Sequence, residues 1–193
     1  YMSHGIYNTR YHWGVPEAEE RAAMEESIDV HRRLTGRRLR GWFSPAITNT
    51  LRTFELAAAC GYDYVADLYH DDQPFPLRTA TGRLISMPYS VDLNDVIVHR
   101  RGGEADAFAR EIRDYFDTVY AEGVEQGRVM CVALHPYWVG QPHRLRAFQR
   151  AMEYVLSHPG VWVATAGEIT DWFRAEHLPA IEAHLAAREA ANG

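Results

Sequence analysis

The sequence predicts an α/β fold in which helices cover a parallel sheet, either open or closed into a barrel. Short apolar segments alternate with longer segments of helical periodicity along the 193 residues, and such alternation is typical of strand–helix–strand units. The segment 129–134 is apolar throughout, as expected for a strand buried on both faces. The length fits one domain covering residues 1–193, and its Ala-rich end, 176–193, is expected to be a peripheral helical tail.

The helices are predicted from their ends and from their apolar stripes. Pro16 suits the start of a helix and Gly36 suits its end. Asn49 is a suitable N-cap for a second helix, and Thr165 with Glu168 forms the capping box of a later one. Two further segments carry apolar residues at helical spacing. The predicted helices span 17–34, 49–60, 106–123, 145–157 and 165–173, with a last amphipathic segment from Pro179.

Five short apolar segments are predicted to be strands, and reactive residues follow them. The strands are 41–43, 63–65, 84–87, 129–134 and 161–164, after a short stub at 1–3. In parallel α/β folds the chemistry gathers in loops after the carboxyl ends of the strands. His4 follows the stub, and His135 follows the most apolar strand. We therefore expect the two imidazoles to meet over a common cavity at one rim of the sheet.

Composition excludes several kinds of partner. The net charge of −6 argues against a protein that binds a nucleic-acid backbone. The basic run 32–40 could form such a patch, but it spans a helix C-terminus, where cations complement the helix dipole. No apolar run is long enough to cross a membrane, and we expect a cytoplasmic rather than a secreted protein. Cys60 and Cys131 lie among apolar residues, which favours buried thiols over a disulfide or a metal site.

His135 is the predicted catalytic residue. A histidine at a strand end, against a partly apolar wall, can take up and release a proton near neutral pH and pass it to a leaving group. The alternative is a structural histidine whose ring nitrogens are satisfied within the protein. The functional interpretation is favoured because His135 lies where loops converge and precedes Pro136, Tyr137 and Trp138.

His4 could bind a metal ion, or it could hydrogen-bond a substrate or water. A catalytic metal ion usually needs three protein ligands. The spacing His-x3-His would supply a second one, but position 8 is Asn8. His12 is a further candidate ligand only if the loop folds back. The prediction for the cofactor is therefore none, or a single divalent metal ion such as zinc.

Acidic and aromatic side chains supply candidate substrate contacts. Asp71 and Asp72 could be the two carboxylates of a glycosidase, but adjacent residues of an extended chain point to opposite sides. We expect one of them to orient a substrate amide and the other to cap a loop. Trp13, Trp42 and Trp138 could line an apolar pocket, although aromatic residues more often belong to the core.

Taken in order, these segments resemble the polysaccharide deacetylases, a NodB-like superfamily that includes carbohydrate esterase family 4. The resemblance extends from residue 3 to about residue 173 and is closest to the allantoinase-like branch. The order and spacing of the motifs are more specific to this superfamily than any single motif is. The motifs are Ser3-His4-Gly5, Gly41-Trp42-Phe43, the run from Tyr62 to Phe75, the run from Met87 to Asp95, and Ala133-Leu134-His135-Pro136.

The resemblance implies a distorted (β/α) barrel of about seven strands that hydrolyses an amide, acetamido or cyclic ureide bond. It makes His135 the general acid that protonates the leaving nitrogen, and His4 the first histidine of a metal- or water-binding motif. It places Asp71 and Asn94 near a small-molecule amide or amino-sugar substrate. Together with Trp42 and Trp138 from the aromatic set, they are the predicted substrate contacts.

Two departures from the family pattern matter. The family's aspartate base and its first strands would precede Tyr1, and Asn8 replaces the second motif histidine. We therefore expect an N-terminal segment of about a hundred residues, either cleaved, disordered or supplied as a separate chain. Without it a sheet edge is unpaired, which a homo-oligomer could cover. The alternative function is a catalytically degenerate barrel that binds a carbohydrate or another small molecule.

Overall fold

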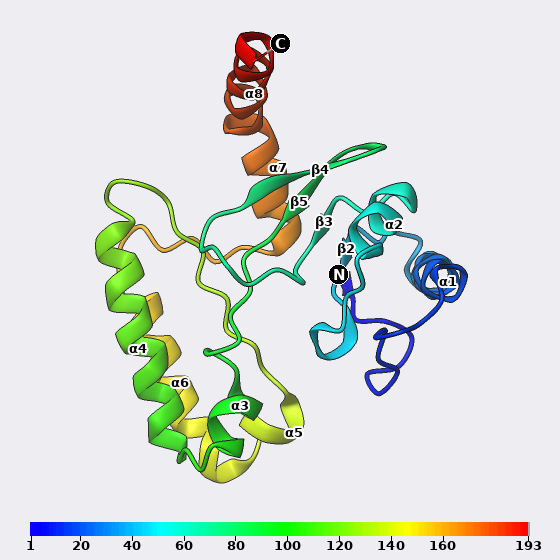
Figure 1. Cartoon of the computed structure of the whole chain (residues 1–193). Helices are drawn as coiled ribbons and strands as arrows, with labels where there is room; N and C mark the ends of the chain where they lie inside the picture. The colour runs from blue at the N-terminus through cyan, green and yellow to red at the C-terminus, as the bar shows by residue number, and fades with distance from the viewer. Residues whose placement is uncertain (193) are drawn as a thin grey trace. The chain divides into compact units, whose positions relative to one another are not determined.

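A computed structural model of the chain describes residues 1–192. The chain divides into two compact units, each of which is described by itself. Unit 1 comprises residues 1–68, 74–87 and 164–193, and unit 2 comprises residues 69–73 and 88–163. Within the described residues the named strands all belong to unit 1, whereas both units contain helices (Figure 1). That the whole chain acts as one domain stays a prediction.

Unit 1 is built on a five-stranded sheet with the order β1-β2-β3-β5-β4. Neighbours among β1, β2, β3 and β5 are parallel, and β4 pairs with β5 as an antiparallel hairpin (Figure 1). The predicted α/β class with a parallel sheet is therefore confirmed, and β4 is an antiparallel edge that the sequence did not indicate. The strands are β1 (Met2–Ser3), β2 (Gly41–Trp42), β3 (Tyr64–Val65), β4 (Phe75–Thr79) and β5 (Gly82–Ser86).

The helices of unit 1 begin and end largely where their capping residues predict. Gly36 adopts the left-handed conformation that ends α1, with φ of 67°, and Thr165 and Glu168 form the capping box of α7. The predicted N-cap at Asn49 is wrong. α2 begins at Thr53, because a 3-10 turn precedes it and the Thr53 hydroxyl accepts the Thr50 N–H. The elements are α1 (Glu17–Thr35), η1 (Pro45–Ile47), α2 (Thr53–Ala59), α7 (Ala166–Glu176) and α8 (Leu178–Asn192).

The sheet buries apolar side chains on both faces. Along β3, Tyr64 and Val65 point to opposite sides and belong to two different clusters. One cluster packs the sheet against α1 and α2, and it includes Met24, Leu39, Trp42, Leu56, Val65 and Leu84. The other packs Tyr64, Ile85 and Met87 against Phe173 of α7. Helices therefore cover both faces, as in other parallel sheets.

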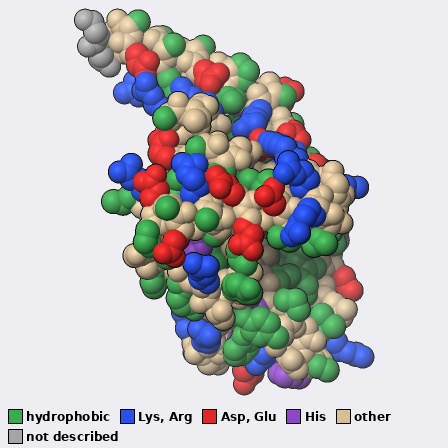
Figure 2. Space-filling model, turned by 90° about the vertical axis from the view of Figure 1, so that its right-hand side faces the viewer, with side chains coloured by type: hydrophobic (Ala, Val, Ile, Leu, Met, Phe, Trp, Pro, Cys, Tyr) green, Lys and Arg blue, Asp and Glu red, His purple; other side chains and the backbone are tan. Residues whose placement is uncertain are grey.

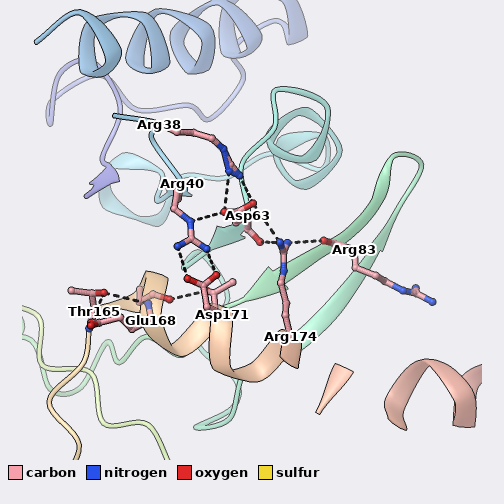
Figure 3. A network of polar contacts seen from close by, with 10 residues as sticks. Arg38, Arg40, Asp63, Arg83, Thr165, Glu168, Asp171 and Arg174 are labelled. Carbon is pink, nitrogen blue, oxygen red and sulfur yellow. Dashed lines mark hydrogen bonds and ion pairs between the residues drawn. The ribbon is translucent and has the colours of Figure 1, made fainter. Parts of the chain in front are cut away.

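A charged network joins the start of β3 to α7 (Figure 3). Asp63, which is 8% exposed, accepts hydrogen bonds from Arg38, from Nε of Arg40 at 2.6 Å and from Nη1 of Arg174 at 3.4 Å. Arg40 also donates to Asp171 of α7 through Nη1 at 2.8 Å. That hydrogen bond holds the pKa of Asp171 below its usual value. Because the network is centred on a buried carboxylate, it fixes α7 against the sheet.

The C-terminal helix α8 is tied to the β4–β5 hairpin by exposed ion pairs. Arg78 pairs with Glu189 at 2.9 Å and Arg83 pairs with Glu182 at 3.3 Å. Figure 2 shows acidic and basic side chains interspersed along this end of the chain. Exposed pairs of this kind each contribute about 0–1 kcal/mol to stability. The attachment of α8 is thus weaker than that of α7.

Unit 2 consists of four helices around one apolar core. The longest two, α4 and α6, pack against each other through side chains such as Phe108, Ile112, Phe116, Ala151 and Val155. Both lie within three residues of their predicted bounds. None of the helices in residues 1–192 is long and apolar enough to span a bilayer. The helices are α3 (Asp95–Arg100), α4 (Ala105–Glu122), α5 (Pro136–Val139) and α6 (Pro142–Leu156).

Two predicted strands are absent from the sheet. The segment 129–134 is extended but half-buried, and its one bridge joins Ala133 to Asn94. An apolar run forms a strand only when a neighbour pairs with it along its length, which composition does not reveal. The segment 161–164 is not a strand either, since Trp162 and Val163 are 56% and 74% exposed.

Candidate active site

Polar side chains of unit 1 gather after the carboxyl ends of its parallel strands. His4 follows β1, Ser44 follows β2 and Asp67 follows β3. The His4 ring stacks on Phe43 at 4.6 Å between centroids, and its Nδ1 donates to the Phe43 carbonyl at 3.1 Å. Because a carbonyl can only accept, this bond fixes the proton on Nδ1 and makes Nε2 the acceptor nitrogen of the neutral ring.

His12 lies beneath the loop that follows His4. The loop does fold back, because a Cβ on Gly5 would lie 3.9 Å from Nε2 of His12. His12 is only 3% exposed, and its backbone N–H donates to Oγ1 of Thr48 at 2.8 Å. Its Nδ1 is 3.6 Å from Oε1 of Glu20. His12 is therefore packed inside unit 1 beside a carboxylate.

Glu20 is the buried carboxylate of this cluster, with 1% of its surface exposed. It accepts hydrogen bonds from the hydroxyls of Thr50, at 2.8 Å, and Thr53. Burial alone would raise the pKa of Glu20, but the neighbouring His12 ring and the hydrogen bonds from Thr53 and Thr50 outweigh burial and hold the pKa below its usual value. Glu20 is therefore a carboxylate whose charge is satisfied inside the protein.

Asp67 is a second buried carboxylate at this edge of the sheet. Its Oδ1 accepts the backbone N–H of Ser44 at 3.0 Å. Its Oδ2 is buried and has no hydrogen-bond partner among the described residues. Burial raises the pKa of Asp67 to about 6, although the bonds from Ser44 oppose the rise. Asp67 therefore changes its charge in a pH range where an ordinary aspartate is fully ionised.

The side chains near His4 do not fit a metal ion. Within residues 1–192, no group of three or more His, Cys, Asp or Glu side chains is placed to hold one. The described part of the chain therefore offers no ligand set for the zinc ion expected from His4 and His12.

Trp42 belongs to the hydrophobic core of unit 1. None of its surface is exposed, and its Nε1 donates to Oγ of Ser44 at 3.1 Å. The prediction that Trp42 contacts a substrate is not supported by this position, since the ring has no surface left for a ligand. Its alternative role in core packing accounts for its contacts.

The strongest candidate for catalysis in unit 2 is a pair formed by Asp95 and His135. Nδ1 of His135 lies 2.7 Å from Oδ1 of Asp95. The other oxygen, Oδ2, accepts the backbone N–H groups of His135 at 2.8 Å and of Val139 at 3.2 Å. The Asp95 side chain is fully buried, whereas 27% of the His135 side chain is exposed. Three hydrogen bonds to one carboxylate thus fix the imidazole and the helix that follows it.

Asn94 organises the segment that carries Asp95. Its Oδ1 accepts the backbone N–H groups of Val96, at 3.0 Å, and Ile97, so that Asn94 is the N-cap of α3. Its Nδ2 donates to the hydroxyl of Tyr89 at 3.2 Å. Its backbone forms the bridge to Ala133, two residues before His135. Asn94 therefore links the start of α3 to the segment that ends at His135.

An open pocket of about 500 Å³ lies in unit 2, with Tyr89 and the carboxylates of Asp71, Asp72 and Asp92 among its lining residues. Oδ1 of Asp71 accepts the backbone N–H of Gln73 at 2.9 Å. Asp72 forms an ion pair with Arg128 at 3.4 Å. Asp71 therefore stabilises a turn, and the two adjacent aspartates have different partners, as their spacing predicts.

Trp138 lies half-buried in α5, three residues after His135. Its ring stacks on the His99 ring at 6.0 Å between centroids, with the planes 14° apart. The guanidinium of Arg144 lies 4.7 Å from the Trp138 centroid. The sequence predicted a substrate contact here, and the described contacts are with protein side chains.

The predicted site residues thus fall into two sets. Asn94, His135 and Trp138 come together around α3 and α5 in unit 2, whereas His4 and His12 lie in unit 1. That His4 and His135 share one cavity stays a prediction. The sequence did not identify Asp95 as a site residue, because its partner lies 40 positions further along the chain. The available signal was a histidine directly after an apolar segment, together with an aspartate in the first turn of a helix.

Comparisons of sequence and structure identify similar proteins. The chain matches no protein-family model. A protein of Schizosaccharomyces pombe, named as a candidate polysaccharide deacetylase, is 36% identical over 124 residues, which cover 58% of this chain and 39% of that protein.

Solved structures match nearly the whole chain. The PuuE allantoinase is 34% identical with a TM-score of 0.85, and the match covers 91% of this chain and 59% of that one. A candidate polysaccharide deacetylase from Pseudomonas aeruginosa PAO1 is 31% identical with a TM-score of 0.84, covering 92% and 60%. The chain thus spans about 60% of the length of these proteins. The fold, the motifs and these matches agree that the chain is a homologue of polysaccharide deacetylases and of an allantoinase.

Proposed function

We propose that this chain is part of a hydrolase that acts on a non-peptide carbon–nitrogen bond, by deacetylating an amide or opening a ureide ring. The observation that carries the proposal is the pair formed by Asp95 and His135. A fully buried carboxylate holds an imidazole of which 27% is still exposed. Such an arrangement suits a group that exchanges protons with a bound molecule.

The pair determines which ring nitrogen can serve a substrate. An ionised carboxylate only accepts hydrogen bonds, so Nδ1 of His135 carries the proton that points to Asp95. Nε2 is then the nitrogen that can face a substrate. In the hydrolysis, water adds to the carbonyl carbon and the carbon–nitrogen bond then breaks. The departing nitrogen needs a proton, because an amine anion is a poor leaving group. Protonated His135 supplies that proton from Nε2, and Asp95 stabilises the charged ring until the transfer.

The pocket beside Tyr89 is the proposed substrate site of unit 2. Its carboxylates, including Asp71, can accept hydrogen bonds from the N–H groups of an amide, ureide or amino sugar. Tyr89 accepts a hydrogen bond from Asn94, the neighbour of Asp95. His135 itself is not among the residues that line the pocket. The similarity to an allantoinase and to polysaccharide deacetylases supports this class of substrate. No step of the proposed reaction is assigned to a metal ion, since the described side chains do not fit one.

The proposal is tested by replacing His135. Turnover of an N-acetylglucosamine oligomer and of a cyclic ureide is measured for the protein, for His135→Ala and for His143→Ala. His143 is an exposed histidine of α6 and serves as the matched control. We expect His135→Ala to lower kcat by about a hundredfold or more, as the loss of a general acid does. His143→Ala should leave kcat unchanged.

Three outcomes separate the alternatives. A hundredfold loss in His135→Ala alone supports the general acid. Nearly full turnover in His135→Ala contradicts it. Tight binding of either compound without turnover in the unmodified protein would favour the catalytically degenerate binding protein instead.

A further inference from the structure

The helix that follows His135, α5, is too short to be stable without contacts from other helices. His135 is the N-cap of α5, and α5 contains only Pro136–Val139. A single helical turn is unstable in isolation, because nucleation costs more than its few hydrogen bonds return. The orientation of the His135 imidazole therefore depends on the contacts that α3 and α6 make with α5.

One face of α3 contacts α5 at two places. Asp95 and His99 are four residues apart, so they lie on the same side of α3, one turn from each other. Asp95 accepts the backbone N–H groups of His135 and Val139, at the two ends of α5. His99 stacks on Trp138 with the two ring planes 14° apart. Nδ1 of His99 donates to the Gly103 carbonyl at 2.8 Å, which fixes the plane of that ring.

Arg144 of α6 contacts the same tryptophan in two ways. Its guanidinium lies 4.7 Å from the centroid of the Trp138 ring, within the range of a cation–π interaction. Its Nη1 also donates to the Trp138 carbonyl at 3.4 Å, which accepts the backbone N–H of Gln141 as well. Trp138 is thus fixed through both its ring and its backbone.

We propose that Trp138, held by His99 and Arg144, is a positioning residue for His135 rather than a substrate contact. The inference rests on the proposed function, because it concerns the delivery of the proton by that histidine. Asp95 sets the tautomer of the imidazole and anchors the backbone at both ends of α5, and the Trp138 contacts hold the part of the helix between those ends. A shift of about 1 Å in a reacting group is enough to slow a reaction by about a hundredfold.

The proposal predicts a specific division between kinetic constants. A substrate-binding tryptophan would change KM when it is removed, because ground-state contacts are lost. A positioning residue changes kcat and leaves KM nearly unaltered, because the misplaced acid matters only in the transition state. The Trp138→Phe variant keeps an aromatic face for Arg144, and it should retain most of the activity.

The experiment uses the full chain and four variants: Trp138→Leu, Trp138→Phe, Arg144→Met and, as the matched control, Arg146→Met. Arg146 is an exposed arginine on the same helix as Arg144. Trp138→Leu and Arg144→Met should lower kcat about tenfold with KM within about twofold, the size expected for one lost cation–π contact. Arg146→Met should change neither constant. In parallel, proton NMR follows solvent exchange of the Nδ1 proton of His135, which should become about tenfold faster in the same two variants.

The outcomes distinguish this inference from the proposed function. If His135→Ala is inactive and Trp138→Leu loses kcat with faster Nδ1 exchange, both hold. If His135→Ala is inactive but Trp138→Leu raises KM alone, or leaves the Nδ1 proton unchanged, the positioning role is overturned and the general acid remains. If His135→Ala stays active while Trp138→Leu still speeds exchange, the contacts position an imidazole that is not the general acid, and both proposals fail.

Discussion

Each unit of the molecule contains a histidine beside a buried carboxylate, and the two pairs differ in ways that separate structure from chemistry. In unit 1, Nδ1 of His12 lies 3.6 Å from Oε1 of Glu20, with side chains 3% and 0% exposed. In unit 2, Nδ1 of His135 lies 2.7 Å from Oδ1 of Asp95, with side chains 27% and 0% exposed. Both carboxylates are fully buried, whereas of the two imidazoles only that of His135 is partly exposed to solvent.

The partners of the carboxylates differ as well. Glu20 accepts the hydroxyls of Thr50 and Thr53, so its hydrogen bonds hold α1 to the start of α2 and to the segment before it. Asp95 accepts two backbone N–H groups that belong to the short helix after His135, together with the ring itself. A histidine and a carboxylate thus hold elements together inside unit 1, whereas in unit 2 we propose that such a pair orients a proton donor. Histidine and acid in proximity do not define a catalytic site without exposure.

The largest expected effect comes from Asp95→Asn. The amide oxygen can still accept the two backbone N–H groups, while the amide nitrogen would face Nδ1 of His135 and reverse its tautomer. We expect kcat to fall by about a hundredfold or more while the circular dichroism spectrum is retained. Activity close to that of the unmodified protein would show that Asp95 does not control the imidazole.

The matching change in the other pair should affect stability and not chemistry. Glu20→Ala leaves two threonine hydroxyls and His12 without their buried acceptor, so we expect the free energy of unfolding to fall by about 3–5 kcal/mol. Urea unfolding measures the change, with the exposed Glu26→Ala on the same helix as the control. A loss below about 1 kcal/mol would mean that Glu20 is not an internal brace.

Asp67 differs from both pairs. It is a buried carboxylate, and among the described residues no histidine lies within hydrogen-bond distance of it. Its pKa is raised to about 6, from 3.8. Its contribution to stability is therefore complete below about pH 3.8 and is lost as the pH rises through about 6. That loss amounts to at most about 3 kcal/mol.

Asp67→Asn cannot ionise and should remove this part of the pH dependence. The free energy of unfolding, measured between pH 4 and pH 7, should fall less steeply with pH in the variant than in the unmodified protein. Parallel curves for the two proteins would show that Asp67 does not titrate in this range.

The smallest effect is expected at an exposed ion pair. Asp171 is 61% exposed on its side chain and pairs with Arg40, so Asp171→Ala should lower the free energy of unfolding by only about 0.5–1 kcal/mol. High salt should reduce this difference further. Thermal unfolding in low and high salt tests it, and a loss as large as that of Glu20→Ala would contradict the distinction between buried and exposed carboxylates.

Local signals in the sequence were sufficient for elements that depend on neighbours in the chain. Gly36 ended α1 and the pair Thr165/Glu168 started α7, as predicted, because a cap acts within one turn. The strand predicted at 129–134 is wrong because strand formation depends on pairing with a partner elsewhere, and in this segment only Ala133 forms a β-bridge.

The same limit applies to the candidate site. His135 was identified by its place after an apolar segment, but Asp95 was not recognised as its partner, since 40 positions separate them. Trp42 was predicted to contact a substrate because aromatic residues suit pockets and cores alike, and only its position in the sheet showed that it is buried.

The proposed role of His135 depends most directly on which of its ring nitrogens carries the proton. Nitrogen-15 NMR of the His135 side chain, in the unmodified protein and in Asp95→Asn, identifies which nitrogen carries the proton in the neutral imidazole. The structure predicts Nδ1–H in the unmodified protein and Nε2–H in the variant. A neutral His135 protonated at Nε2 in the unmodified protein, or a tautomer that Asp95→Asn leaves unchanged, would contradict the proposal that Asp95 prepares this histidine to deliver a proton.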